Sequence, residues 1–226
     1  MKKSMAAPFA QLPPEARNQL ERLKSRVVLS ATKKQIRSIL FLSYNHGEGT
    51  TSVATNFAQA LGQDKRFRTL MVDANTRTPA LAVGDYQQSE NGRLVFSDVF
   101  AGEVESWSLP KPSAGANLSV VTSGSPAYHP SQVFDHKKFA QFIRNAKKLF
   151  HFIIFDSSPI GRYYDSIVIG SHVDAVILVV RAEKTQLHEL KWAKQMLQDS
   201  NIPLLGLVLN RRRFRIPSFL FQRFFK

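Results

Sequence analysis

The chain of 226 residues contains no cysteine, which excludes disulfide bonds and favours a reducing compartment. It also lacks any apolar run approaching the roughly 20 residues needed to cross a bilayer. Its N-terminus, Met1 to Pro8, has basic residues but not the sustained apolar segment of a signal peptide. We therefore expect the protein to stay in the cytoplasm. An apolar content of 43% is sufficient for the core of one domain.

Acidic side chains are scarce. The 17 Asp and Glu residues are outnumbered by 31 Lys and Arg residues, which gives a formal net charge of +14. Such a charge implies an anionic partner, which could be a membrane surface, nucleic acid or an acidic protein. The cations are spread along the chain and no recognised nucleic-acid motif accompanies them. We therefore do not expect nucleic acid as the partner.

The segment Ser43 to Thr51 has the glycines of a phosphate-binding P-loop but lacks its lysine, since Thr50 stands in that place. In such a loop glycines let backbone N–H groups converge on phosphates, and a Ser/Thr hydroxyl binds magnesium. Residues 37–42 predict a buried strand before the loop, and Thr51 to Leu61 predict a helix after it. The positive end of that helix favours an anion even without the lysine. A plain strand-to-helix connection is the alternative interpretation.

Two further apolar runs, Thr69 to Asp73 and Phe152 to Asp156, each end in an aspartate. This pattern is typical of parallel strands that bring carboxylates to the edge of a sheet where ligands bind. The alternative is that each aspartate only caps the loop that follows it.

Strands and helices alternate along the rest of the chain, which predicts an α/β fold with a doubly wound, mostly parallel sheet. Tyr86 to Ala116 is less regular and is expected to form surface loops and a short helix. We predict an N-terminal arm with one helix over 1–35, a P-loop NTPase-like domain over 36–210 and a basic aromatic tail over 211–226. The other expected strands are Leu118–Val121, Ala175–Arg181 and Leu204–Leu209, and the other expected helices are Pro14–Val27, Ser131–Leu149 and Gln186–Asp199.

The P-loop, Met71–Pro79 and Ile153–Pro159 resemble, in order and spacing, the Walker A, A′ and B motifs of bacterial tyrosine kinases. These are cytoplasmic ATPase-like domains that work with chain-length regulators in capsule and exopolysaccharide export. The resemblance covers roughly residues 36 to 210 and implies the P-loop NTPase fold of this family, with ATP or ADP and Mg²⁺ as cofactors. It implies metal contacts from Thr51, Asp73 and Asp156, and the two aspartates would be catalytic if the chain is active. The nucleotide contacts that it implies are Gly47, Glu48, Gly49, Thr50, Thr51, Ser52, Arg77 and Asn210.

The sequence departs from the family pattern at three positions inside the motifs that would bind nucleotide and support catalysis. Thr50 replaces the lysine, Asn75 replaces a second aspartate of the A′ motif, and Ser158 replaces a proline of the B motif. Losing a charged hydrogen bond weakens binding by roughly one to two powers of ten. Losing one preorganised donor slows a reaction by roughly 10²–10³, and an Asn at 75 cannot act as general base. Lysines at 33, 34 or 65, or an arginine of a neighbouring subunit, could in principle replace the missing charge. We expect nucleotide binding to be weak or absent and catalysis to be impaired or lost.

The C-terminal tail interleaves six cations with phenylalanines and has no acidic residue. Such a segment suits an interface with anionic lipid, where arginines meet head groups and rings enter the lipid boundary. Docking on a partner protein is the alternative. None of the five tyrosines lies beyond Asn210, whereas autokinases of the family end in a tyrosine cluster. The predicted membrane or partner contacts are Arg211, Arg212, Arg213, Phe214, Arg215, Phe219, Phe221, Phe224 and Phe225.

Three functions follow from these features. The leading hypothesis is a kinase-like regulatory subunit of exopolysaccharide or capsule assembly, at the inner face of the plasma membrane. It would dock on a membrane-embedded chain-length regulator of the Wzz/Wzc kind. The alternatives are an active ATP-dependent tyrosine kinase with rebuilt phosphate contacts, and a membrane-associated positioning ATPase. The charged helix at Pro14–Val27 loosely resembles the arm with which the family forms rings, so a homo-oligomer is a further hypothesis, with packing on its own domain as the alternative.

Overall fold

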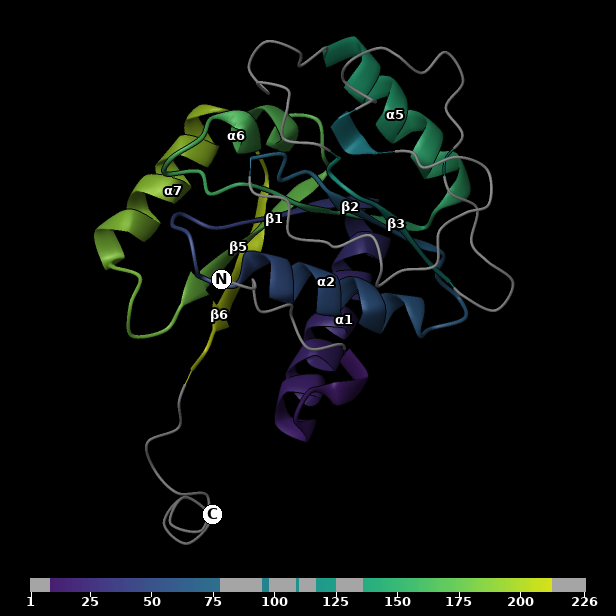
Figure 1. The fold of residues 1–226 in the computed structure, drawn as a ribbon, viewed down its shortest axis with the longest axis horizontal. Coiled ribbons are helices and arrows are strands. Elements are labelled where there is room, and N and C mark those ends of the chain that lie inside the picture. Colours follow the sequence, from purple (N-terminus) through teal and green to yellow (C-terminus); the bar gives the residue numbers. More distant parts are fainter. Residues whose placement is uncertain (1–8, 78–94, 98–108, 110–116, 125–135, 213–226) are drawn as a thin grey trace, which may run out of the picture.

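The computed structural model of the chain describes residues 9–77, 95–97, 109, 117–124 and 136–212 (Figure 1). Six strands form one sheet, and each of their pairings is parallel. The strands are β1 (Ser38–Leu42), β2 (Thr69–Asp73), β3 (Leu118–Val121), β4 (Phe152–Asp156), β5 (Ala175–Arg181) and β6 (Leu204–Asn210). Their order across the sheet is β3-β2-β4-β1-β5-β6. The predicted α/β fold with a parallel sheet is confirmed, and every predicted strand is present.

Helices cover both faces of this sheet, so its central strands are buried and read as continuous apolar runs. The helix α1 (Pro14–Lys34) and the helix α2 (Thr50–Gly62) lie on one face. The other face carries α5 (His136–Leu149), α6 (Asp165–Gly170) and α7 (Leu187–Asp199). A short 3₁₀ turn, η1 (Phe9–Gln11), precedes α1. Figure 1 shows the two layers on either side of the strands.

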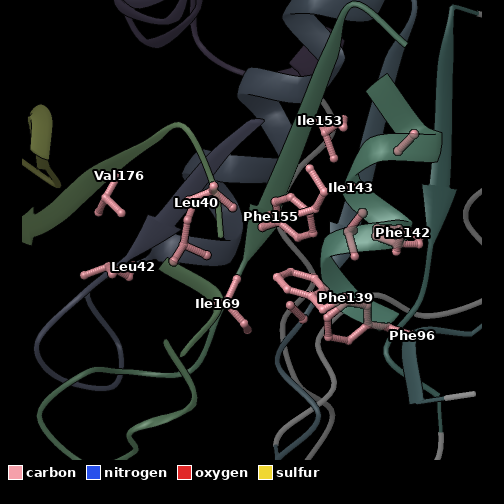
Figure 2. Packing of buried hydrophobic residues seen from close by; sticks show 14 of the residues in the cluster. Leu40, Leu42, Phe96, Phe139, Phe142, Ile143, Ile153, Phe155, Ile169 and Val176 are labelled. Carbon is pink, nitrogen blue, oxygen red and sulfur yellow. The ribbon is translucent and has the colours of Figure 1, made fainter. Parts of the chain in front are cut away.

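The core on the α5 face contains a group of aromatic rings among aliphatic side chains (Figure 2). Phe139 and Phe142 of α5 point toward Phe155 of β4, and the ring centres of Phe139 and Phe155 are 5.7 Å apart at 68°. Phe96 completes the group, 6.0 Å from Phe139. Each fully buried ring of this kind stabilises the fold by roughly 1.5–3 kcal/mol. The cluster anchors β4, the strand that ends at Asp156.

Helix α1 is longer than the prediction of Pro14–Val27. It continues to Lys34 because its apolar stripe continues to Ala31, and it ends where Gln35 turns into the left-handed region with φ 55°. Val27 and Ala31 are buried against the same core as Phe57 of α2. Helix α1 therefore packs on its own domain, as the alternative interpretation of this helix had it.

Two other differences concern α5 and α6. Helix α6 was not predicted, because its six residues are too short to show a helical period. The predicted helix Ser131–Leu149 is described only from His136, and most of the irregular Tyr86–Ala116 segment lies outside the described residues. Among the helices that the structure describes, none combines the length and the apolar character needed to cross a membrane.

Asp174 fixes the opposite edge of the sheet, where the strands begin. Its Oδ2 accepts hydrogen bonds from the backbone N–H groups of Arg37 and Ser38, both at 2.8 Å, and its Oδ1 lies 2.6 Å from Lys147 Nζ. Burial raises the pKa of Asp174, but the hydrogen bonds from Lys147 and the two amides outweigh it, so its pKa is lowered. This side chain joins the starts of β1 and β5 to the end of α5.

Candidate nucleotide site

The predicted P-loop lies at the carboxyl edge of the sheet, between the end of β1 and the start of α2. Gly47 and Gly49 both have positive φ angles, 80° and 91°, and Gly49 is the residue that caps α2. A Cβ atom on Gly47 would meet no atom within 4 Å, whereas one on Gly49 would overlap the side-chain amide of Asn210. Position 49 thus requires glycine for two reasons, its backbone conformation and the close approach of Asn210.

Glu48 closes the loop from inside. Its side chain is buried at 3% exposure, and its carboxylate accepts hydrogen bonds from the backbone N–H of Tyr44 at 3.1 Å and of Asn45 at 3.4 Å. The hydroxyl of Thr185 donates to the same carboxylate. The backbone carbonyl of Glu48 accepts a hydrogen bond from Asn210 Nδ2 at 2.8 Å. Glu48, predicted as a nucleotide contact, therefore shapes the loop and ties it to the segment after β5 and to the end of β6.

The three predicted metal contacts lie together on the β4 side of the loop. Thr51 Oγ1 donates a hydrogen bond to Asp156 Oδ2 at 2.6 Å. Asp73 is paired in register with Asp156 on the neighbouring strand. Both aspartates are fully buried, and burial together with the charge of Asp73 raises the pKa of Asp156 well above its ordinary value. The other carboxylate oxygen of Asp156, Oδ1, is buried without a hydrogen-bond partner.

This arrangement fits a magnesium ion. Mg²⁺ prefers oxygen ligands and is usually bound by one or two carboxylates, with waters and phosphates completing its shell. Asp156 would hold the ion directly or through water, Thr51 would supply its hydroxyl, and Asp73 would lie nearby. A divalent cation would also neutralise the charge that two adjacent buried carboxylates concentrate. The unpartnered Oδ1 of Asp156 is the atom that such an ion would satisfy.

Two of the departures from the family pattern contact each other. Ser158 Oγ donates a hydrogen bond to Asn75 Oδ1 at 2.8 Å, and both side chains are buried. The backbone N–H of Asn75 donates to Asp73 Oδ1 at 3.0 Å, and the carbonyl of Ser158 accepts from the hydroxyl of Ser166 in α6. The amide oxygen at position 75 is thus engaged by the serine that replaces the proline, and the two changes fit each other.

Arg77, predicted as a nucleotide contact, is held in an ion pair at the start of α6. Its Nε lies 2.6 Å from Asp165 Oδ2 and its Nη2 lies 3.3 Å from Asp165 Oδ1. The guanidinium also lies 4.5 Å from the ring centre of Tyr163. The hydrogen bond with Asp165 raises the pKa of Arg77. The sequence placed Asp165 just after the B motif but gave no signal that it pairs with the A′ arginine.

The end of β6 lies on the other side of the loop. The backbone N–H of Arg211 donates to Asn210 Oδ1 at 2.8 Å, and Arg211 has a φ of 57°. Arg211 Nε would lie 3.9 Å from a Cβ atom on Gly49. The sequence predicted Arg211 as a membrane or partner contact and did not place it at the glycine loop. The nearest signal in the sequence was its position directly after Asn210.

The remaining predicted site residues are two residues in the first turn of α2, Thr50 and Ser52, and the arginines and phenylalanines of the tail. Thr50 is the first residue of α2 and is 8% exposed, and the carbonyl of Ser52 accepts a hydrogen bond from Asn56 Nδ2 at 2.9 Å. Arg212 is exposed to solvent. The tail residues that lie outside the described part of the chain are Arg213, Phe214, Arg215, Phe219, Phe221, Phe224 and Phe225.

Comparison with known proteins assigns the family. No family model matches the chain. The tyrosine-protein kinase CpsD of Streptococcus pneumoniae serotype 4 is 30% identical over 189 residues, which cover 84% of this chain and 81% of CpsD. The chain belongs to the bacterial tyrosine kinases. This member of the family has Thr51, Asp73 and Asp156 at the predicted metal contacts and Thr50 where the P-loop lysine is expected.

Solved structures support the same fold. The chimerical protein CapA2B2 superposes with a TM-score of 0.77 at 24% identity, covering 91% of this chain and 88% of that one. The septum site-determining protein MinD of Pyrococcus horikoshii OT3, complexed with Mg-ADP, gives 0.64 at 22% identity, covering 83% of this chain and 76% of MinD. At these identities the likeness shows the fold alone. The chain has the fold of the P-loop NTPases.

Proposed function

We propose that this protein is a regulatory subunit of capsule or exopolysaccharide assembly that binds Mg-nucleotide weakly and does not transfer its phosphate. One observation carries the proposal. The bonded pair Thr51 and Asp156, with one open carboxylate oxygen, stands beside a glycine loop whose lysine position is Thr50. The residues that would bind the metal, Thr51 and Asp156, are retained, whereas the lysine that would bind the phosphates is replaced by Thr50.

Phosphoryl transfer depends on positioning and on cations that neutralise the charge of the transferred group. Thr50 offers no charge, and Arg77 is already paired with Asp165 at 2.6 Å. A general base must also accept the proton of a tyrosine hydroxyl. Asn75 has no carboxylate to do so, and its amide oxygen accepts a hydrogen bond from Ser158. These contacts support a site that holds a nucleotide without turning it over.

The proposed place of action is the cytoplasmic face of the plasma membrane, on a membrane-embedded chain-length regulator. The family resemblance and the net charge of +14 support this, as does the sequence of the tail. Basic residues near an anionic leaflet contribute about 1 kcal/mol each. Deletion of residues 213–226 is expected to abolish sedimentation with anionic vesicles, and neutral vesicles serve as the control. Equal sedimentation of the full and shortened chains would exclude the tail as the membrane contact.

Calorimetry with Mg-ADP and Mg-ATP tests the nucleotide proposal. We expect weak binding by the wild type and binding tighter by roughly 10–100-fold in Thr50→Lys, because the lysine restores a charged hydrogen bond. Incubation with Mg-ATP and a tyrosine-containing partner tests transfer. Phosphotyrosine that forms with the wild type and disappears in Asp156→Ala would establish an active kinase in place of the proposed regulatory subunit.

A further inference from the structure

Arg211 brings a positive charge to the glycine loop from the end of the sheet. Its Nε lies 3.9 Å from the position of a Cβ atom on Gly49, the residue directly before Thr50. We infer that Arg211 is a phosphate-binding residue of the nucleotide site, which supplies a positive charge from the end of β6 to a loop that has none at position 50. This inference rests on the proposed binding of nucleotide.

The backbone of Arg211 is held in an uncommon conformation that places it there. Its φ of 57° lies in the left-handed region, which residues other than glycine seldom adopt outside constrained sites. Its N–H donates to Asn210 Oδ1 at 2.8 Å, while Nδ2 of the same asparagine donates to the carbonyl of Glu48 at 2.8 Å. Both ends of the Asn210 amide therefore join the end of β6 to the glycine loop, and the chain turns so that Arg211 lies beside Gly49.

Arg211 is also open to bind an anion. Arg77, the arginine that was predicted as a nucleotide contact, is paired with Asp165. No ion pair within the described ranges involves Arg211, and its side chain is exposed. Arginine binds phosphate with several N–H donors in a fixed planar arrangement. A phosphate at the start of α2 would meet this guanidinium together with the backbone N–H groups of the loop.

The sheet order decides which phosphate Arg211 meets. Asp156 ends β4 on one side of β1, whereas Arg211 follows β6 on the other side, beyond β5. A magnesium ion held by Asp156 and Thr51 would serve the end of the nucleotide whose phosphate group is transferred in active relatives of this fold. The Asp156 side of the loop therefore marks the γ end, and Arg211 lies toward the α-phosphate. A cation there strengthens the binding of ADP and ATP alike but does not reach the group that is transferred, which agrees with a nucleotide-binding subunit that does not act as a kinase.

Calorimetry on full-length variants tests the inference. Arg211→Ala is expected to weaken the Kd for Mg-ADP by roughly 10–100-fold, the loss of a charged hydrogen bond. Mg-ATP should be weakened by the same factor. Arg212→Ala is the matched control, since it removes the adjacent exposed arginine, whose atoms are not among those nearest to a Cβ on Gly49. It should change either Kd by less than about threefold, because an exposed charge away from the ligand contributes little. Arg211→Lys keeps the charge and should retain most of the affinity.

Each result has one meaning. Unchanged affinity in Arg211→Ala, or an equal loss in Arg212→Ala, would overturn the role of Arg211 and leave the proposed function standing. A loss confined to ATP would overturn its placement at the α end. A wild type that binds neither nucleotide would overturn the role and the proposed function together. If Arg211→Ala is poorly folded by circular dichroism, Arg211→Gln takes its place, since it removes the charge but keeps a long side chain. A weaker Kd in Arg211→Gln together with retained affinity in Arg211→Lys supports the role, and an unchanged Kd in Arg211→Gln refutes it.

Discussion

Replacing Gly49 by alanine tests the geometry of the glycine loop most directly. The added methyl group would overlap the side-chain amide of Asn210, and the residue would have to keep a φ of 91°. A left-handed conformation costs an L-residue about 1–2 kcal/mol. Displacing Asn210 also breaks its hydrogen bond to the carbonyl of Glu48, which contributes about 1 kcal/mol. The two effects together predict a loss of about 2–3 kcal/mol in the free energy of unfolding.

The chain supplies a matched control. Gly47 lies two residues away with a φ of 80°, but a Cβ atom there meets nothing within 4 Å. Gly47→Ala should therefore cost only the conformational part, about 1–2 kcal/mol. Urea unfolding followed by circular dichroism measures both variants, and the difference between them isolates the contact with Asn210. For a domain of this size Gly49→Ala should lower Tm by roughly 4–12 °C.

Two outcomes would refute this reasoning. Equal losses in the two glycine variants would mean that Asn210 moves aside at no cost. A full additional loss for Gly49→Ala in an Asn210→Ala background would mean that the clash lies elsewhere, because that background has already removed the overlapping amide. We expect instead that the double variant shows only the conformational cost of alanine at position 49.

Three further predictions concern the metal side and the sheet. Asp156→Asn should remove the Mg²⁺ dependence of ADP affinity, because an amide binds Mg²⁺ less strongly than a carboxylate. Calorimetry in Mg²⁺ and in EDTA measures this dependence, and a dependence that persists in the variant would exclude Asp156 as the metal ligand. Ser158→Ala should lower the free energy of unfolding by about 1–2 kcal/mol, since it removes the hydroxyl that donates to the buried oxygen of Asn75. An unchanged free energy of unfolding in urea would contradict the contribution of this hydrogen bond. Asp174→Ala should destabilise the fold near pH 7, and because the folded pKa is lowered, the difference from wild type should shrink as the pH falls below about 4. A difference that stays constant across an acid series would show that packing, not charge, explains the loss.

The strands were predictable from the sequence because each is a short apolar run followed by a turn, and burial on both faces makes such runs continuous. Thr51, Asp73 and Asp156 were predictable as a group for the same reason, since parallel strands end at one edge. Helix α6 was not, because six residues carry no period. The end of α1 was missed because the predicted apolar stripe stopped at Val27, although no helix breaker follows before Lys34. The packing of Ala31 shows that the stripe continues.

The contacts between loops were beyond the reach of local patterns. Asn75 and Ser158 are 83 residues apart, and Arg77 and Asp165 are 88 apart, so neither pair leaves a periodic signal. In the sequence Arg211 belongs to a run of cations and phenylalanines, and that composition suggested a contact with anionic lipid. Its position at the glycine loop depends on the left-handed turn after Asn210, which the residue types do not indicate.

The hydrogen bond between Asn210 and Glu48 spans 162 residues, and the bond between Thr185 and Glu48 spans 137. During synthesis the glycine loop leaves the ribosome before the side chains that fix it, which follow 137 and 162 residues later. A chain that has not yet reached Asn210 cannot form the finished loop, so a nucleotide offers it no stabilisation while it is being made.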